Sequence, residues 1–503
     1  MGQNVGRTTF SRRDRQQYRI KVQQCLEVLA TMLAEQPFAR DEPMTGVEVE
    51  LNLVAASDLG PAPTAAGVLQ AIGAGQFQSE LGRWNLELNL PPRPLPGHEW
   101  RHLEQHLLDE LGIARAKARD FDAELAVIGI LPTLQRQHLG IDALSADRRY
   151  VLLNEQMLSS RGEPVRLDIL GHEPVGRRHL PPDHLVADFD SIAPEAACTS
   201  LQLHLQVHPD SFAGYWNAAQ CLAAVQLAVG ANSPFLLGCR LWAETRVPLF
   251  EQSCDVRTPE LRNQGVRPRV WFGERWISSV LDLFAENGRY FPALLPITEE
   301  TDPVAELAAG RVPELTELRL HNGTIWRWNR PVYDVADGVP HVRVENRVLP
   351  AGPTPVDMVA NALLFYGLLR TLVEEDRPLW SRMSFDAAEE NFTTAARHGL
   401  EEPLYWPGSG WIRPDELLLR KLLPQAADGL VRWGVAEDVI NRYLSVIEQR
   451  CVTRRTGASW QLDTVAALER RGVNRPAALH GMMARYLESS TANHPVHTWA
   501  LPG

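Results

Sequence analysis

Several stretches of the chain alternate between apolar and polar residues, which is the pattern of a β-strand with one buried face. The clearest examples are Gly46–Val54, Gly82–Leu90, Thr199–Val207 and His341–Leu349. Shorter stretches at Leu125–Ile130, Thr316–Arg319 and Thr324–Arg327 are also predicted to be strands. A core built on strands is therefore expected in the part of the chain before Pro350.

Other stretches space their apolar residues as an amphipathic helix does. Between the strands we predict helices at Ser11–Glu35, Thr64–Gly73, Glu99–Glu124 and Ser211–Val229. After Pro355 the pattern is helical almost throughout, at Val356–Glu374, Phe385–Gly399, Pro414–Gly434, Ala436–Cys451, Leu462–Arg471 and Arg475–Tyr486. This order predicts an α+β fold, in which one antiparallel sheet has helices packed on one side and a helical C-terminal portion follows.

The first strand carries two carboxylates on one face. Residues two apart in a strand point the same way, so Glu48, Glu50 and Asn52 are expected to point together. Neighbouring carboxylates repel each other, and the arrangement becomes favourable when a divalent cation lies between them. A solvated polar face is the simpler alternative for such a pair.

Three further segments carry polar residues at similar spacing. They are the acidic pair Glu80 and Glu87, the strand face Gln202, His204 and Gln206, and the strand face Arg343, Glu345 and Arg347. Taken singly, each has a plain structural explanation, such as a structural histidine or a ladder of exposed ion pairs. Together they supply the hard oxygen ligands that Mg²⁺ prefers, beside arginines suited to phosphate. The set therefore indicates phosphoryl transfer from a nucleotide.

The composition narrows the class of protein. The chain has 503 residues, of which 45% are hydrophobic and 22% charged, and its formal charge is -12. This acidic balance argues against a nucleic-acid partner. Lysine occurs only at Lys21, Lys117 and Lys421, and none lies in a Gly-rich stretch, so a phosphate-binding loop lysine is excluded.

Cysteine spacing and apolar runs bear on the compartment. The six cysteines are scattered without a Cys-x-x-Cys pair, so neither a zinc site nor a disulfide framework is predicted. No signal peptide is apparent, and no apolar run reaches the roughly 18 residues of a membrane span. Leu222–Leu237 comes closest, but Gln226 and Pro234 interrupt it. We therefore expect a cytoplasmic protein with no membrane partner.

These motifs, in this order, resemble the glutamate–cysteine ligase family and its bacterial carboxylate–amine ligases, distant relatives of glutamine synthetase. The resemblance covers about residues 40 to 375 and includes the segments Ala231–Phe235 and Trp242–Arg246. Arg454–Gln461 is similar to a Gly-containing loop of actinobacterial members. On this basis we divide the chain into an N-terminal helix at 1–40, a ligase catalytic domain at 41–375 and a helical C-terminal region at 376–503.

The resemblance implies a curved six-stranded antiparallel sheet of the glutamine synthetase-like fold, with two or three Mg²⁺ ions at its base. It implies metal ligands at Glu48, Glu50, Glu80, Glu87, His204 and Glu345. Arg347 falls where an arginine touches the transferred phosphate, and we expect it to be catalytic together with Glu345. Arg246, Arg327 and Arg330 are expected to hold substrate carboxylates, and Arg454 to contact the phosphates of ATP.

The implied reaction is an ATP-dependent ligation of small molecules. The γ-carboxylate of L-glutamate becomes an acyl phosphate, and the amine of L-cysteine attacks it to give γ-glutamylcysteine, ADP and phosphate. Three alternatives stay open: an amide ligase with a different amine acceptor, a non-catalytic nucleotide-binding relative, and a metal-dependent hydrolase that needs no ATP. The oligomeric state is not indicated.

Overall fold

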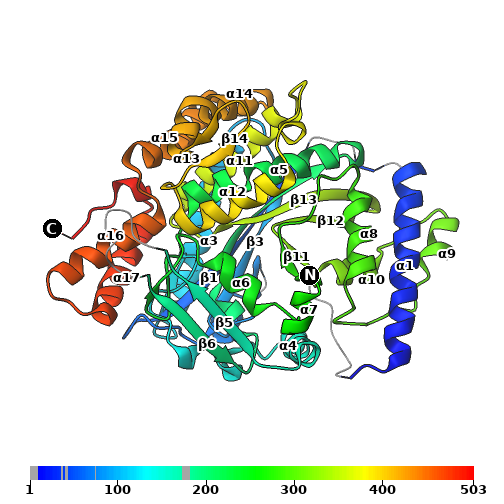
Figure 1. The fold of residues 1–503 in the computed structure, drawn as a ribbon, viewed down its shortest axis with the longest axis horizontal. Coiled ribbons are helices and arrows are strands. Elements are labelled where there is room, and N and C mark those ends of the chain that lie inside the picture. Colours follow the sequence, from blue (N-terminus) through cyan, green and yellow to red (C-terminus); the bar gives the residue numbers. More distant parts are fainter. Residues whose placement is uncertain (1–8, 36–37, 40–42, 74, 173–181, 503) are drawn as a thin grey trace.

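A curved antiparallel sheet organises the fold (Figure 1). The structure is a computed structural model, and it describes residues 9–35, 38–39, 43–73, 75–172 and 182–502. The strands lie in the order β12 (Asn329–Ala336), β13 (Val339–Pro350), β7 (Ser200–Val207), β1 (Met44–Ala55), β3 (Asn85–Pro94) and β2 (Phe77–Ser79). β4 (Ala123–Ala126) pairs with the end of β1 as a seventh strand. The predicted six-stranded antiparallel sheet is confirmed, with β4 added.

One face of the sheet is the hydrophobic core. The valines and leucines of β1 are buried, and two long helices, α5 (Pro209–Gly230) and α11 (Pro355–Val373), lie over the same face. Gln226 of α5 exchanges hydrogen bonds with Asn346 of β13, and the Tyr366 hydroxyl of α11 donates to the carbonyl of His204. The polar side chains of the strands are thereby left on the opposite face, where they line a cavity.

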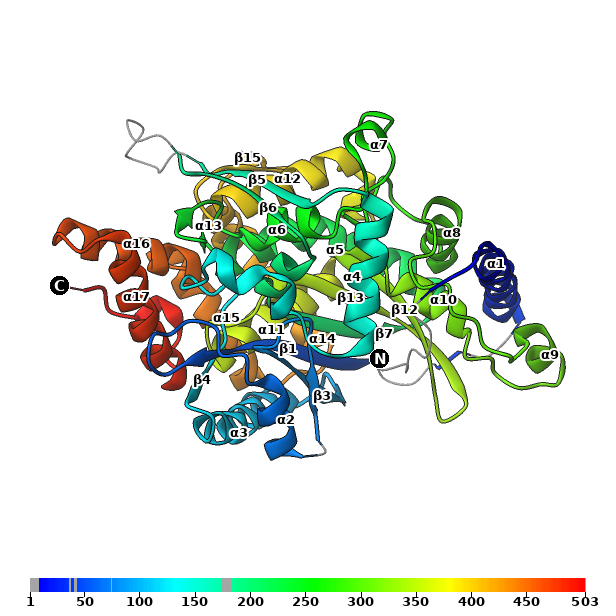
Figure 2. The same ribbon diagram turned by 90° about the horizontal axis from the view of Figure 1, so that it is seen from below.

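The remaining helices surround this centre. Figures 1 and 2 place α1 at one end of the molecule and the pair α16–α17 at the other. Before β13 the helices are α1 (Arg12–Glu35), α2 (Ala65–Ile72), α3 (Glu99–Arg119), α4 (Arg148–Arg161), α6 (Arg246–Ser253), α7 (Pro259–Asn263), α8 (Val280–Tyr290), α9 (Pro303–Ala308) and α10 (Thr316–Asn322). After α11 they are α12 (Phe385–His398), α13 (Pro414–Leu417), α14 (Leu423–Arg432), α15 (Glu437–Thr453), α16 (Gly457–Arg470) and α17 (Arg475–Thr491).

Four two-stranded ribbons and several short 3₁₀ turns complete the described elements. The ribbons are β5–β6 (Val165–Leu170 and His184–Phe189), β8–β9 (Phe235–Leu236 and Cys239–Arg240), β10–β11 (Val270–Trp271 and Trp326–Arg327) and β14–β15 (Leu404–Trp406 and Gly410–Ile412). The 3₁₀ turns are η1 (Arg136–Leu139), η2 (Ile141–Ala143), η3 (Ala193–Ala197), η4 (Leu379–Ser381) and η6 (Val496–Thr498).

Three of the predicted strands differ from the structure. Leu125–Ile130 overlaps β4 only at Leu125 and Ala126. Thr316–Arg319 begins α10, because Leu318 and His321, three residues apart, share one buried helical face. In Thr324–Arg327 only Trp326–Arg327 forms a strand, and it pairs with β10 instead of the main sheet. Four or five residues are too few to separate the two periodicities.

The edge strand β12 was not predicted. It contains Pro331, which reads as a strand breaker because proline cannot donate a ladder hydrogen bond. β12 pairs on one side only, with β13, so an edge position tolerates this proline.

The predicted helix Pro414–Gly434 is interrupted. A π-helical turn, η5 (Leu418–Leu422), separates α13 from α14, and Pro424 stands at the start of α14. Proline has no N–H to donate back into the preceding turn, which explains a wider turn just before it.

One helix of the described residues has the length and apolar character of a membrane span. It is α11, and 89% of its most apolar window is buried inside the protein. Its apolar character is therefore explained by its place as a core helix packed against the sheet. The prediction that Leu222–Leu237 is the segment most similar to a membrane span was wrong.

Candidate active site

The register of the sheet gathers the predicted residues. Glu48 lies between Gln202 of β7 and Asn89 of β3, and Glu50 lies opposite Glu87. On the other side of β7, His204 lies opposite Glu345, and Glu345 lies opposite Arg330 of β12. Strands that are far apart in the sequence thus present their polar side chains on one continuous face.

Glu48, His204 and Glu345 form one group on this face. His204 Nε2 lies 3.1 Å from Glu48 Oε1. Burial acts to raise the pKa of Glu48, but the contact with His204 outweighs it and lowers that pKa. Burial likewise opposes ionisation of Glu345. However, the guanidinium groups of Arg330 and Arg347 each lie 2.8 Å from the Glu345 carboxylate and hold its pKa well below the usual range. Glu48 and Glu345 are therefore both ionised.

His204 is held on both ring nitrogens. Arg343 Nε donates to His204 Nδ1 over 3.2 Å, so Nδ1 acts as an acceptor and the ring proton lies on Nε2, facing Glu48. Binding of a cation through Nε2 therefore requires the contact with Arg343 to open and the proton to move to Nδ1.

A second group of carboxylates consists of Glu50, Glu80 and Glu87. Their negative charges repel one another. Burial, reinforced by Glu87, raises the pKa of Glu50 to about 7, although Arg347 opposes the shift. Burial, with the negative charges of Glu87 and Glu50 added, raises the pKa of Glu80 well above the usual value. Directly opposed carboxylates such as Glu50 and Glu87 destabilise a sheet unless something positive offsets them.

This donor set fits divalent cations. Buried carboxylates beside an imidazole are hard ligands, and a cation beside Glu50 and Glu80 would relieve the repulsion that helps to raise the pKa values of these two groups. In the part of the chain that the structure describes, no three His, Cys, Asp or Glu side chains already surround one point as ligands. Glu345 and Glu50 are instead held by arginine, glutamine and backbone groups, so cation binding must displace some of these contacts.

Arg347 projects from an irregularity in the sheet. The pairing of β13 with β7 shifts register between Asn346 and Leu349, which leaves the Arg347 and Val348 carbonyls outside the regular ladder. Arg246 donates to both carbonyls and pairs with Glu244 at 3.2 Å. Arg347 Nη1 then reaches Gln202 at 2.6 Å and Glu345 at 2.8 Å. Among the described residues no acceptor meets the buried Nε of Arg347, which is therefore available to a ligand.

A cavity of about 770 Å³ opens over this face. Its sheet side carries Glu48, Glu50, Glu80, Glu87, Gln202, Arg330 and Arg347. The other walls come from α4, η3, α10, the end of α6 and β11. They include Arg149, Tyr150, Leu153, Met157, Ile192, Glu195, Cys254, Thr316, Arg319 and Trp326. The cavity thus combines an acidic floor with arginines and apolar side chains, as a site for charged small molecules requires.

Two of the arginines predicted to hold substrate do not line this cavity. Arg246 is buried beneath the β13 irregularity. Arg327 is 1% exposed, donates to Glu286 and Asn287, and packs over the ring of Trp271. Only Arg330 of this set reaches the cavity, where it pairs with Glu345.

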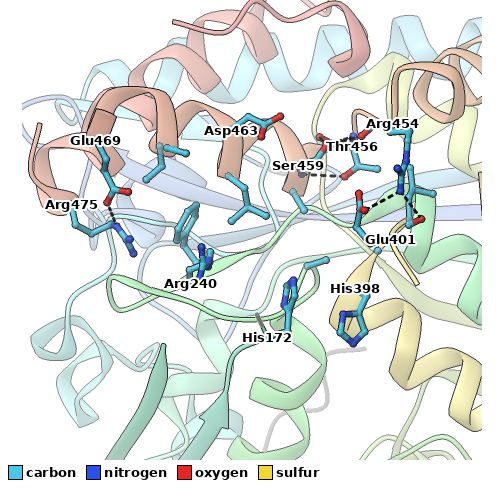
Figure 3. Close-up of a pocket in the computed structure, with 18 residues that line it drawn as sticks. His172, Arg240, His398, Glu401, Arg454, Thr456, Ser459, Asp463, Glu469 and Arg475 are labelled. Carbon is cyan, nitrogen blue, oxygen red and sulfur yellow. Dashed lines mark hydrogen bonds and ion pairs between the residues drawn. The ribbon is translucent and has the colours of Figure 1, made fainter. Parts of the chain in front are cut away.

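Arg454, predicted to contact ATP, lies in a different place. It ends α15 in a left-handed conformation and pairs with Glu401 at 3.0 Å. Figure 3 shows this contact on the wall of a second cavity of about 270 Å³, between α16 and the end of α12. The structure therefore does not bring Arg454 together with the acidic group.

Several cavity residues were not among the predicted site residues, including Gln202, Tyr150 and Glu195. Gln202 shares the strand face of His204, so alternation alone could have included it. Tyr150 and Glu195 come from α4 and η3, which cross the cavity from outside the sheet. No periodic signal marks them, because their place depends on how these elements fold over the strands.

Comparisons with known proteins identify the family of the chain and solved structures of similar fold. The sequence matches the glutamate–cysteine ligase family 2 (GCS2) over residues 44–483. No curated protein matches the chain significantly. Among solved structures, the fold is similar to the glutamate–cysteine ligase of Francisella tularensis in complex with AMP, with a TM-score of 0.54, 12% identity and coverage of 93% of this chain and 91% of that one.

A second similar structure is a bifunctional glutathione synthetase from Pasteurella multocida, with a TM-score of 0.50 and 12% identity. The match covers 94% of this chain but only 55% of that longer one. At such identity the likeness concerns the fold, whereas the family match spans both the strands of the site and most of the C-terminal helices. The chain belongs to the glutamate–cysteine ligase family 2, and it is an ATP-dependent carbon–nitrogen ligase that joins a carboxylate to an amine.

Proposed function

We propose that the chain activates the γ-carboxylate of L-glutamate with ATP and couples it to the amine of L-cysteine, giving γ-glutamylcysteine, ADP and phosphate. The observation that carries this proposal is the single polar face that Glu48, His204, Glu345 and Arg347 share. On it Glu48 contacts His204, Glu345 contacts Arg347, and His204 and Glu345 are paired across neighbouring strands. It is the arrangement that phosphoryl transfer to a carboxylate requires, with acidic ligands beside a fixed guanidinium.

The reaction passes through an acyl phosphate because oxide is a poor leaving group. The carboxylate oxygen attacks the terminal phosphorus of ATP and releases ADP. The amine then attacks the acyl carbon, phosphate leaves, and the nitrogen loses a proton. No protein nucleophile is needed, and no cysteine is assigned a role in the chemistry.

We assign to Arg347 the stabilisation of the transferred phosphoryl group. Its pKa is raised above the usual value by Glu345 and Glu50 despite burial, so it stays charged throughout. Glu345 positions Arg347, and Arg330 offers its guanidinium to a substrate carboxylate at the edge of the same group.

We propose that Mg²⁺ is held by two ligand groups, Glu48 with His204 and Glu345, and Glu50 with Glu80 and Glu87. When bound, the metal neutralises the triphosphate and the charge that develops on it. The two groups would hold two of the two or three ions expected. Arg454 is left out of this site because it belongs to the second cavity.

A cytoplasmic location is also proposed. All six cysteines are free in the structure, which agrees with a reducing compartment.

An amine-dependent ADP-release assay tests the proposed function. The purified chain is incubated with ATP, Mg²⁺, L-glutamate and a panel of amines. We expect cysteine to stimulate ADP release, and mass spectrometry to detect γ-glutamylcysteine. If another amine stimulates release and cysteine does not, the ligase has a different acceptor. Product formed without nucleotide would contradict the ATP-dependent mechanism.

A further inference from the structure

Glu195 is an acidic side chain of the cavity that the chemistry described above does not use. It lies on η3, between the ribbon β5–β6 and the strand β7, and it lines the same cavity as Glu50 and Arg347. None of the six predicted metal ligands comes from this part of the chain.

The turn that carries Glu195 is held firmly in place. The Ile192 N–H donates to Asn154 Oδ1 of α4 over 2.9 Å. On the other side Ala196 packs against Gly82, where a Cβ would come within 3.0 Å of the alanine methyl. The position of Glu195 is therefore fixed by its backbone.

The Glu195 carboxylate has no partner of opposite charge. Among the described residues no hydrogen bond or ion pair reaches its side chain, and the nearest guanidinium, Arg347, is bound to Glu345 and Gln202. Burial and the nearby Glu50 raise the pKa of Glu195 to about 8. Burial, with the charge of Glu195 added, also raises the pKa of Cys254. A ligand that brings positive charge to this wall would be stabilised.

The geometry favours an ammonium group over a further metal ion. Ligands of one Mg²⁺ ion lie about 2 Å from it, so neighbouring ligands come within about 3 Å of each other. Glu87 meets Glu80 closely enough to raise its pKa, through its charge and at hydrogen-bonding range. Glu195 makes no such contact with any carboxylate, and it stands beside the apolar side chains of Ile192 and Cys254. A single carboxylate in such surroundings suits one N–H of an ammonium group.

We propose that Glu195 binds the α-ammonium group of the amino acid whose side-chain carboxylate is activated. Resting on the proposed function, this assigns Glu195 as a specificity residue for the donor substrate. The same cavity holds Arg149, Arg319 and Arg330, so it offers both charges that a zwitterionic amino acid needs.

Glutarate, which is glutamate without the ammonium group, provides the test. ADP release is measured for L-glutamate and for glutarate with the wild-type chain, with Glu195→Gln, and with the surface control Glu448→Gln. We expect the wild type and the control to prefer glutamate. In Glu195→Gln the ratio of the two kcat/KM values falls by about tenfold to a hundredfold, mostly through the KM of glutamate.

The possible failures are distinguishable. If the wild type does not use glutamate, the proposed function fails, and this assignment falls with it. If the wild type uses glutamate but Glu195→Gln weakens both donors equally, the proposed function stands and the assignment is overturned. A higher Mg²⁺ requirement in Glu195→Gln, with an unchanged preference, would overturn it in favour of a metal ligand. Thermal melting checks that the variant is folded.

Discussion

At the scale of single residues, the site depends on carboxylates whose charge the protein itself compensates unevenly. Glu345 is held by two arginines, whereas Glu50, Glu80 and Glu87 face one another. Glu345 holds two arginines in place, whereas the group of Glu50, Glu80 and Glu87 would be stabilised by bound cations. Removing a charge should therefore affect activity and stability differently at the two kinds of position.

The variants Glu48→Gln and Glu345→Gln test this site. Each keeps the shape of the side chain and removes its charge, so we expect ADP release to fall by about 100-fold or more. Glu345→Gln also leaves Arg330 and Arg347 buried without their partner, so it should lose stability as well, whereas Glu48→Gln should not. Steady-state ADP release and urea denaturation measure the two effects, with Glu448→Gln as the control. Activity that survived both changes would show that the metal site is misplaced.

His321 provides a pH dependence away from the active site. It is 4% exposed, donates through Nε2 to the Asn287 carbonyl, and has its pKa lowered by burial from 6.5 to about 4. A base whose folded pKa is depressed stays neutral in the fold but takes up a proton in the unfolded chain. Its contribution is therefore complete above the unfolded pKa and is lost as the pH falls from about 6.5 to 4.

The expected loss from His321 is about 3 kcal/mol of unfolding free energy across that range. Urea denaturation of the wild type and of His321→Gln at several pH values separates this loss from that of other groups. We expect the wild-type free energy of unfolding to fall more steeply than that of the variant. Parallel curves would mean that His321 is not neutral and buried in the fold.

At the scale of elements, the register shift in β13 is the feature that aims Arg347. In a regular ladder the Arg347 and Val348 carbonyls would accept hydrogen bonds from β7. The register shift prevents this, and Arg246 donates hydrogen bonds to both carbonyls instead. Arg246 in turn forms an ion pair with Glu244. Glu244 is fully buried and also accepts a hydrogen bond from the Ser233 hydroxyl. We therefore expect Arg246 to affect the site although it lies outside the cavity.

The variant Arg246→Met should lose about 3–5 kcal/mol of stability, because Glu244 is left buried without its partner. In the double variant Arg246→Met/Glu244→Gln we expect part of the stability to return. The kcat should stay low in both, since the two carbonyls of the irregular strand remain unsatisfied. Chemical denaturation and steady-state kinetics separate these effects. A double variant that regained full activity would show that Arg246 acts only through stability.

At the scale of the whole molecule, the C-terminal helices are tied to the back of the site. Asn232 donates to the carbonyl of Ala351, just after β13, and to the hydroxyl of Tyr486 on α17. Gln461 of α16 donates in turn to Asn232. Gly457, at the start of α16, lies so close that a Cβ would come within 2.1 Å of Asn232 Oδ1. The end of β13 and the pair α16–α17 therefore share one buried polar network.

Gly457→Ala should push α16 away from this network. The Asn232 side chain cannot yield without losing several hydrogen bonds, so we expect a cost of about 1–3 kcal/mol. Hydrogen exchange followed by mass spectrometry should show faster exchange in α16 and α17, with less change in β1 and β7. Gly481→Ala is the matched control in α17, because its Cβ meets only Leu468 at 3.4 Å. Equal protection in both variants would contradict the tight contact.

The family match, which runs across residues 44–483, includes these helices, so the prediction of a separate region at 376–503 needs its own test. Within the described residues α11 packs against α14 and α15, and Gly429 of α14 approaches the backbone of Gly367. Limited proteolysis that released a stable fragment ending near residue 375 would support the division.

The sequence by itself determined which side chains share a face. Alternation is a local property of a strand, so it identified Glu48 with Glu50, His204 with Gln202, and Glu345 with Arg347, and the long helices followed from their own periodicity. Short segments and the proline-containing edge strand escaped this reasoning, because four or five residues do not define a period and an edge position tolerates proline.

Only the tertiary structure decided which of these faces meet and what covers them. The register placed Glu345 opposite His204, although 140 residues separate them along the chain. Because α4 and η3 fold over the sheet, Tyr150 and Glu195 line the cavity. Arg330 also lines it, whereas Arg246 and Arg327 are buried elsewhere in the protein. The register of the strands and the lining of the cavity depend on contacts between residues far apart in the sequence, so a local sequence pattern cannot predict them.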